Sequence, residues 1–308
     1  MQVYRNIEAL PLFRNTVLTI GTFDGVHTGH QQVINQMKKR AAEVDGETVI
    51  ITFDPHPRTV INAAAGIQLI NTLDEKIELL SGMGIDHLVV IPFTEDFARM
   101  TAEEYIGRFL IHYFKPHTLI IGYDHRFGKG RAGNYELLKQ QSAIYNYELQ
   151  EIPAHILNSI SVSSTRIREA VSAGDMETAR KLLGYTFFFC GRVVEGNKLG
   201  RTLGYPTANL EVTEKYKLIP GDGIYAVDAI LLNEPDKVYR GMMSIGFRPT
   251  IGVSKRTIEV NIFDFDRMIY GEILKVIVKK FLRPEVKFES LEALREQIAK
   301  DKVASLED

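Results

Sequence analysis

Apolar residues in the first half of the chain recur in short, nearly continuous runs. The runs cover residues 16–20, 48–53, 87–91 and 118–121, and each is rich in β-branched side chains. Such runs are typical of strands that are buried on both faces of a parallel sheet. Their starts lie roughly 30 to 40 residues apart, which is about the length of a βαβ unit.

Helical patterns fill the intervals between these runs. After the first run, apolar residues recur at helical spacing at Val33, Ile34, Met37, Ala41 and Val44. Thr72 with Glu75 and Thr101 with Glu104 fit the capping box, so we expect a helix just after each threonine. A further helix is expected over residues 165–183, with a break near Gly174. Alternating strands and helices predict an α/β fold of the doubly wound, Rossmann-like kind.

The second half of the chain has a different pattern. Strand-like runs are expected over residues 185–194, 224–232, 238–245, 257–264 and 273–282. Turn residues, such as those at 221–223 and 233–236, separate them in place of long helices. This spacing predicts an antiparallel barrel or sandwich, closed by a helix with Leu291, Leu294 and Ile298 on its apolar face. We therefore expect two domains, residues 1–183 and residues 184–308.

Composition narrows the class of protein. Hydrophobic residues make up 45% of the chain and charged residues 25%, which is ordinary for a globular protein. The 37 basic and 39 acidic residues give a net charge of −2, which argues against a protein that coats nucleic acid. Cys190 is the single cysteine, so no internal disulfide or cysteine-rich zinc site is possible. With neither a signal-peptide pattern nor an apolar run of membrane-spanning length, we expect a cytoplasmic protein with no membrane partner.

Candidate chemistry first appears directly after the first strand. Residues 21–30 read Gly-Thr-Phe-Asp-Gly-Val-His-Thr-Gly-His. The glycines let the backbone approach a ligand closely, and His27 and His30 flank the expected start of the next helix. A helix N-terminus at the carboxyl end of a parallel strand suits phosphate. Zinc is the rival ligand, but the histidine pair lacks an evident third ligand, and phosphate is favoured.

This segment resembles the HxGH motif of the nucleotidyltransferase superfamily, and more closely the opening of the bacterial bifunctional riboflavin kinase/FAD synthetases. Residues 53–57, 121–128 and 163–168 match further segments of that family in the same order. HxGH alone also occurs in class I aminoacyl-tRNA synthetases, whereas four motifs in order are specific. The resemblance covers essentially the whole chain. It implies that the first domain adenylylates FMN with ATP, which forms FAD and releases pyrophosphate.

The resemblance also implies roles for individual residues. His27 and His30 would be catalytic, through hydrogen bonds to the ATP phosphates and the developing charge. Nucleotide-binding roles are implied for Gly21, Phe23, Asp24, Gly25, Gly29, Ser163, Ser164, Thr165 and Arg168. Flavin-binding roles are expected for Asp124, Arg126 and Phe127, from a loop with three basic side chains. The ordinary structural alternatives are a capped helix with a paired arginine around Ser164 and a solvated loop around Arg126.

The second domain carries another phosphate-binding pattern. Gly196, Lys198 and Gly200 combine free backbone N–H groups with a positive charge. Thr207 and Asn209 are alternate residues, so in an extended segment both point the same way. Their hydroxyl and amide oxygens are suitable ligands for Mg²⁺. A glycine-rich hairpin without a ligand is the alternative explanation.

Pro206-Thr207-Ala208-Asn209 resembles the motif of riboflavin kinases, and residues 246–250, 258–265, 270–271 and 281–288 follow that family's order. The resemblance implies that this domain phosphorylates riboflavin with Mg·ATP. Glu259 would be the general base, Thr207 and Asn209 metal ligands, and Arg283 a flavin-binding residue. The chain departs from many family members at Glu195 and Asn261, where those members carry histidine.

The sequence therefore predicts a two-domain enzyme of flavin-cofactor synthesis. Its co-substrate would be ATP, its metal Mg²⁺, and its flavins riboflavin, FMN and FAD. A member with one silent domain and a flavin-binding regulator without turnover are the alternatives. A regulator would be expected to lack the phosphate-facing groups, whereas His27, His30, Thr207, Asn209 and Glu259 are all present.

Overall fold

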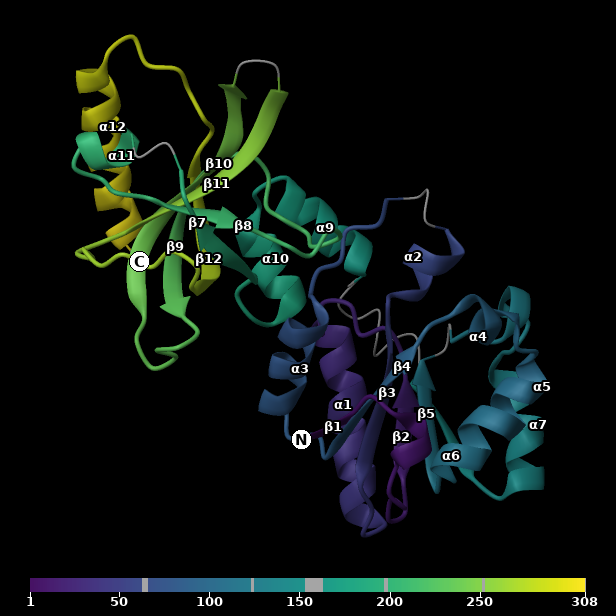
Figure 1. The fold of residues 1–308 in the computed structure, drawn as a ribbon. Helices are drawn as coiled ribbons and strands as arrows, with labels where there is room; N and C mark the ends of the chain where they lie inside the picture. The colour runs from purple at the N-terminus through teal and green to yellow at the C-terminus, as the bar shows by residue number, and fades with distance from the viewer. Residues whose placement is uncertain (63–65, 123–124, 153–162, 197–198, 251–252, 308) are drawn as a thin grey trace. The chain divides into compact units, whose positions relative to one another are not determined.

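A computed structural model describes residues 1–62, 66–122, 125–152, 163–196, 199–250 and 253–307 (Figure 1). The chain divides into two compact units, Met1–Ser164 and Thr165–Asp308. Helices α9 (Ser164–Ser172) and α10 (Met176–Leu183) lie between this division and the predicted domain boundary at Gly184, which stays a prediction. The predicted break near Gly174 is confirmed, because these two helices end and begin on either side of it.

The first unit is built on a six-stranded sheet in the order β1-β4-β3-β2-β5-β6, and every neighbouring pair is parallel. Its strands are β1 (Gln2–Tyr4), β2 (Val17–Ile20), β3 (Thr48–Asp54), β4 (His87–Pro92), β5 (Thr118–Gly122) and β6 (Glu148–Ile152). The predicted parallel, Rossmann-like sheet is confirmed. The four inner strands match the four apolar runs, and the edge strands β1 and β6 were not predicted.

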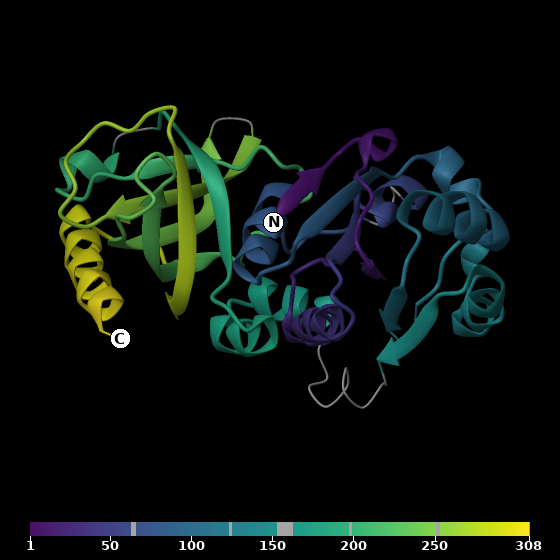
Figure 2. The same cartoon turned by 90° about the horizontal axis from the view of Figure 1, so that it is seen from below.

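Helices cover both faces of this sheet, as Figures 1 and 2 show. On one face, α1 (Thr28–Glu43) and α3 (Leu73–Gly82) pack their apolar residues on a core that includes Val17. On the other face, the π-helical segment η3 (Tyr105–Ile111) and α7 (Tyr135–Tyr145) pack on a core that includes Leu18. Adjacent strand residues fall in different cores because side chains alternate across a sheet.

Shorter helices complete the unit: η1 (Ile7–Ala9), α2 (Pro57–Ile61), α4 (Glu95–Arg99), α5 (Ala102–Glu104), α6 (His112–Phe114) and η4 (Lys129–Arg131). Both predicted capping boxes are present. Thr72 Oγ1 accepts the Glu75 amide at 3.2 Å, and the Thr72 amide donates to Glu75 Oε2 at 3.0 Å. Thr101 and Glu104 repeat the arrangement at 3.2 and 3.1 Å. These reciprocal bonds satisfy donors that a helix start leaves unpaired.

The strand order locates the topological switch point of the sheet. From β2 the chain moves through β3 to β4 on one side, and then crosses back to β5 and β6 on the other side. The carboxyl ends of β2 and β5 therefore lie at the topological switch point of the sheet. Ligands of open α/β sheets bind at this point, where the two sets of loops diverge.

The second unit is a closed barrel of antiparallel strands in the order β10-β11-β8-β7-β12-β9. Its strands are β7 (Phe188–Val194), β8 (Ala208–Glu211), β9 (Gly223–Leu231), β10 (Tyr239–Thr250), β11 (Val253–Ile262) and β12 (Ile273–Arg283). The sequence pattern predicted either a barrel or a sandwich, and the structure is a barrel. Five strands match predicted runs, and β8 was not predicted.

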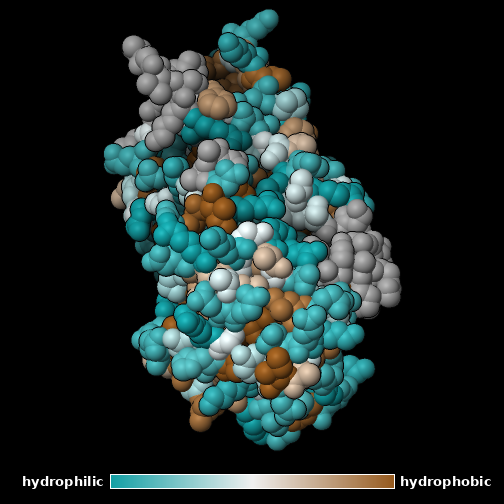
Figure 3. All heavy atoms as spheres, turned by 90° about the vertical axis from the view of Figure 1, so that its right-hand side faces the viewer, coloured by the Kyte–Doolittle hydropathy of each residue, from teal (hydrophilic) through white to brown (hydrophobic). Residues whose placement is uncertain are grey.

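Two further helices belong to this unit, α11 (Leu199–Thr202) and the closing helix α12 (Leu291–Leu306). Helix α12 packs against β9, β10 and β12 (Figure 1). Among the described residues, no helix is both long and apolar enough to cross a membrane. On the face drawn in Figure 3, hydrophilic side chains predominate and apolar ones occur in small groups.

Candidate active sites

The loop from β2 to α1 begins at the switch point and has an unusual backbone. Phe23, Gly25 and Val26 have φ angles of 47°, 92° and 36°. The left-handed region is unfavourable for bulky and β-branched residues, so Phe23 and Val26 carry strain. Phe23 is 3% exposed and Val26 is fully buried, and this packing holds the conformation. Packing of these two side chains in the core therefore fixes the shape of the loop.

His27 and His30 lie together at the start of α1. His27 is the N-cap residue, and its Nδ1 accepts the amide of His30 at 3.3 Å. The two imidazole rings stack with centroids 3.7 Å apart and planes 15° from parallel. The Phe23 ring lies 4.9 Å from that of His30. His30 Nδ1 is a buried atom with no hydrogen-bond partner among the described residues.

Both histidines are neutral at pH 7. Burial lowers the pKa of His27 to about 4, although the charge of Asp24 opposes the shift. Burial, then the charges of His27 and Lys76, hold the pKa of His30 well below its ordinary value. Because Nδ1 of His27 is an acceptor, its neutral ring carries the proton on Nε2. That N–H is a donor suited to a phosphate oxygen.

Asp24 anchors the loop from within. It is 4% exposed, and its Oδ1 accepts the amides of Ile70 at 2.8 Å and Asn71 at 3.4 Å. Its carbonyl oxygen accepts the hydroxyl of Ser164 at 3.1 Å. The structure thus brings Ser164, which is 140 residues later in the chain, to the loop that carries the histidines.

The structure gives a position in the fold for each of the remaining predicted nucleotide-binding residues. A Cβ atom on Gly21 would lie 3.1 Å from the Phe23 ring, so this glycine leaves room for that ring. Gly29 is buried in the first turn of α1, beside the histidines in sequence. Ser163 is exposed and precedes α9, while Thr165 and Arg168 lie on α9 in the second unit. Their nucleotide-binding roles stay predictions.

The predicted flavin loop follows β5 at the same switch point. Asp124 lies outside the described residues, and Arg126 is exposed. Phe127 is 6% exposed, and its ring stacks on Tyr105 with centroids 4.9 Å apart. In this conformation the Phe127 ring packs in the core beside η3, so its predicted contact with flavin stays untested.

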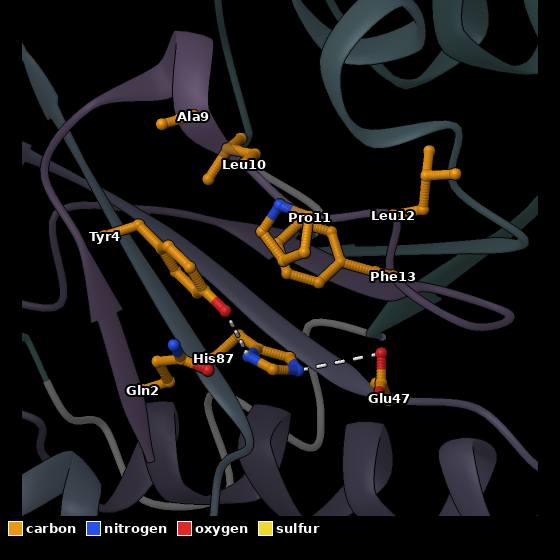
Figure 4. A pocket seen from close by; sticks show the side chains of 9 residues that line it. All are labelled: Gln2, Tyr4, Ala9, Leu10, Pro11, Leu12, Phe13, Glu47 and His87. Carbon is orange, nitrogen blue, oxygen red and sulfur yellow. Dashed lines mark hydrogen bonds and ion pairs between the residues drawn. The ribbon is translucent and has the colours of Figure 1, made fainter.

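A separate depression lies at the opposite end of this sheet, near the first residues of β1, β3 and β4 (Figure 4). Tyr4 Oη lies 3.4 Å from His87 Nδ1, and His87 Nε2 lies 3.6 Å from Glu47 Oε2. Phe13 packs on the His87 ring with centroids 4.8 Å apart. His87 is held between these neighbours.

In the second unit, several predicted residues line one cavity of about 550 Å³. Gly200, Thr207, Glu259 and Arg283 all face it. This volume falls in the range of small-molecule sites. The wall also includes residues that were not predicted as site residues: Met242, Met243, Ser244, Glu285 and Phe288, with Leu291, Leu294 and Ile298 from α12. The apolar face of the closing helix, which was predicted, was the available signal for this wall.

Glu259 and Thr207 are in direct contact at this cavity. Glu259 lies on β11, is 9% exposed, and pairs in register with Asn209 on β8. The Thr207 hydroxyl donates to Glu259 Oε2 at 3.2 Å. A nearly buried carboxylate on β11 therefore meets a hydroxyl that directly precedes β8, and Asn209 lies opposite the glutamate in the strand register. This set of hard oxygen donors fits Mg²⁺.

Two glycines leave no room for side chains around these groups. A Cβ atom on Gly196 would lie 2.1 Å from the side-chain nitrogen of Asn209. A Cβ atom on Gly200 would lie 2.3 Å from the carbonyl oxygen of Tyr205. The backbone is therefore packed closely against the Thr207–Asn209 segment at both points. Lys198, the third residue of the predicted phosphate loop, lies outside the described residues.

The two departures from the family pattern differ in setting. Glu195 is exposed. Asn261 is 5% exposed, and its Nδ2 donates to the carbonyl oxygen of Pro206 at 2.6 Å. Asn261 therefore holds the segment that carries Thr207, and it also lines the cavity.

Arg283 is held at the cavity wall by α12. Its guanidinium donates to Asp301 in a forked arrangement, with Nε–Oδ1 at 2.9 Å and Nη2–Oδ2 at 2.7 Å. The Phe288 ring lies 5.7 Å from the guanidinium carbon. Asp301 is 4% exposed, so the pair fixes α12 to the end of β12. The predicted flavin-binding role of Arg283 is compatible with this position and stays a prediction.

Comparison with known proteins matches both halves of the chain. A family model described as FAD synthetase matches residues 11–166, and one described as riboflavin kinase matches residues 183–307. A protein of Buchnera aphidicola subsp. Schizaphis graminum, named bifunctional riboflavin kinase/FMN adenylyltransferase, is 38% identical over 98% of this chain and 96% of its own. A protein of the same name from Listeria monocytogenes is 38% identical over 93% of this chain and 90% of its own.

A solved structure from Streptococcus pneumoniae shares the whole fold. It is titled a macrolide-efflux protein, and it is 31% identical with a TM-score of 0.88. The match covers 100% of this chain and 99% of that one. The two-part architecture therefore extends to an experimentally determined relative.

Proposed function

From the premise that this chain belongs to the family of bifunctional riboflavin kinase/FMN adenylyltransferases, we propose which residues carry each of its two reactions. The enzyme phosphorylates riboflavin to FMN and adenylylates FMN to FAD, and each step consumes one ATP. We assign the adenylyl transfer to the His27–His30 loop and the kinase step to the cavity of Glu259. The observation that carries the second assignment is the contact between Thr207 and Glu259 at 3.2 Å inside that cavity.

In adenylyl transfer, a phosphate oxygen of FMN attacks the α-phosphorus of ATP, and the bond to pyrophosphate breaks. This chemistry needs positioning and charge stabilisation more than a covalent nucleophile. His27 Nε2–H and His30 would donate to phosphate oxygens as charge develops on them. The loop of Gly21, Phe23, Asp24, Gly25 and Gly29, with Ser163, Ser164, Thr165 and Arg168, would hold the nucleotide. Asp124, Arg126 and Phe127 would contact the flavin.

In the kinase step, the 5′-hydroxyl of riboflavin attacks the γ-phosphorus of ATP. Glu259 would accept the hydroxyl proton as general base. The Thr207 hydroxyl donates a hydrogen bond to Glu259, so the lone pairs of its oxygen can face a cation. Thr207 and Asn209 would hold Mg²⁺, which neutralises phosphate charge when bound. Gly196, Lys198 and Gly200 would contact the phosphates, and Arg283 the flavin.

We further propose that the functional boundary falls near Gly184 and that the enzyme acts in the cytoplasm. The FAD synthetase model ends at residue 166 and the riboflavin kinase model begins at 183, which supports a boundary within this interval. The single cysteine is compatible with a reducing compartment.

Product analysis of two variants tests the division of labour. Each protein is incubated with Mg·ATP and either riboflavin or FMN, and flavins are separated by chromatography. His30→Ala should make FMN from riboflavin but no FAD from FMN. Glu259→Gln should make FAD from FMN and lose the kinase step by at least 100-fold, in keeping with about 10²–10⁴-fold for a general base. Loss of both activities in either well-folded variant would refute the assignment to separate sites.

A further inference from the structure

Lys76 is a buried cation that the proposed chemistry does not use. It lies on α3 and is 6% exposed. Its ammonium donates to the carbonyl oxygen of Thr22 at 2.6 Å and to Thr52 Oγ1 at 3.3 Å. Lysine is almost never buried without a specific set of partners, because desolvation of its charge is costly. The position of these partners suggests why a lysine is buried here.

Both partners lie near the switch point of the sheet. Thr22 follows β2 and opens the loop that leads to His27, while Thr52 lies on β3 near its carboxyl end. Thr52 Oγ1 also donates to the same Thr22 carbonyl oxygen at 3.3 Å. The ammonium therefore ties the first residues of the loop to the neighbouring strand. It does so immediately before the strained residues Phe23 and Val26.

The charge of Lys76 also acts on this site. Burial lowers the pKa of Lys76 to about 8, and the carboxylates of Asp24 and Asp54 oppose that shift. The amine is therefore mostly protonated at pH 7. Its positive charge is one of the causes that keep the pKa of His30 low. The buried charge of Lys76 thus favours the neutral imidazole of His30, which carries a single N–H.

We propose that Lys76 is a positioning residue for adenylyl transfer: its ammonium fixes the Thr22–Val26 loop to β3 and thereby sets the geometry of His27 and His30. Lys76 acts through these residues and is not assigned a contact with substrate. The inference rests on the proposed role of the two histidines. Small displacements of groups that stabilise developing charge can lower the rate about 100-fold.

The test is Lys76→Met, which keeps an unbranched side chain one atom shorter than lysine and removes its charge and donors. We expect kcat/KM for FAD formation to fall about 100-fold, mostly in kcat, while riboflavin phosphorylation in the same protein stays within twofold. Lys38→Met is the matched control. Lys38 is an exposed lysine of the same unit whose ammonium also donates to a backbone carbonyl oxygen, that of Met83 at 2.8 Å. It should leave both reactions unchanged.

A second readout separates positioning from simple support of the fold. Imidazole carbons of the ligand-free protein are titrated by NMR. In Lys76→Met the titration of His30 should move to higher pH than in the parent and in Lys38→Met. An unchanged His30 titration with FAD formation within threefold of the parent would overturn the proposal. If Lys76→Met does not fold, Thr52→Val removes a partner of the ammonium at nearly constant volume, and an unchanged kcat there would overturn it.

The outcome is distinguishable from failure of the proposed function. If His30→Ala abolishes FAD formation and Lys76→Met does not impair it, only the role of Lys76 is refuted. If His30→Ala itself retains full FAD formation, the assignment of the histidines is wrong, whatever Lys76 does.

Discussion

The ion pair between Arg283 and Asp301 should hold α12 in place as a wall of the kinase cavity. The side chains of Arg283 and Asp301 are 19% and 6% exposed, so little water is available to either charge. Asp301 also accepts Gln297 Nε2 at 2.9 Å, within the same helix. Asp301→Asn keeps the shape of the side chain and removes its charge. It leaves the Arg283 guanidinium without its counter-ion beside the apolar residues of α12.

The magnitude follows from the burial of the pair. Breaking a buried ion pair by removing one partner costs about 3–5 kcal/mol. Asparagine retains one acceptor oxygen and Arg283 is partly exposed, so we expect about 2–3 kcal/mol. With an m value of roughly 2 kcal/mol/M in urea, the midpoint for the second unit should fall by about 1–1.5 M. The KM for riboflavin should rise by up to about tenfold, because α12 lines the cavity.

Urea unfolding, followed by far-UV circular dichroism, and steady-state kinase kinetics measure these effects. FAD formation from FMN serves as the internal control and should be unchanged. Lys302→Met is the matched variant on the same helix, because the Lys302–Asp264 pair at 3.5 Å is exposed, with 34% and 93% of the side chains accessible. It should cost less than about 1 kcal/mol. Equal, small effects of Asp301→Asn and Lys302→Met would refute the view that this pair fixes the wall.

Three further outcomes are expected. Gly196→Ala should lower kinase kcat/KM at least tenfold in coupled assays, because its Cβ would displace the Asn209 amide 2.1 Å away; Gly82→Ala, with nothing within 4 Å, should have no effect. Thr207→Ala should raise the Mg²⁺ concentration needed for half-maximal kinase rate, and Thr207→Ser should restore it, whereas equal requirements in both would contradict a ligand role. The lowered pKa of His27, about 4, means that the unfolded state binds more protons between pH 4 and 6.5. His27 alone should therefore cost the first unit about 2 kcal/mol on going from pH 7 to pH 5. In denaturant titrations His27→Asn should reduce that dependence without abolishing it, because His30 also has a lowered pKa.

The sheet could be predicted from the sequence only where strands are buried on both faces. The inner strands β2 and β3 are almost wholly buried, so their apolar runs are continuous. The edge strands β1 and β6 are largely exposed or half-buried, and β6 reads Glu-Leu-Gln-Glu-Ile. An edge strand gains its place from pairing on one side, and pairing leaves no local pattern in the sequence. The short strand β8 escaped prediction for a related reason, since only its pairing with β7 and β11 defines it.

The candidate sites likewise contain some groups that the local sequence predicts and some contacts that it does not. His27 and His30, or Thr207 and Asn209, lie within short motifs, so local sequence is enough to group them. Thr207 and Glu259 are 52 residues apart in the sequence, and their contact depends on the register of β8 with β11. The loop anchor between Asp24 and Ser164 spans 140 residues. Contacts of this kind depend on the topology of the fold, which residue spacing does not reveal. The resemblance to a family was what assigned these distant residues to the same site.

Asn261 shows what the structure adds to a departure from a family pattern. In sequence, an asparagine where many relatives carry histidine raises a question about the kinase site. In the structure its Nδ2 donates to the Pro206 carbonyl oxygen at 2.6 Å and so holds the turn before Thr207. A neutral histidine could supply the same kind of N–H donor from that strand position. The departure therefore leaves an N–H donor at this position of β11, and the side chain of Glu195 is exposed to solvent.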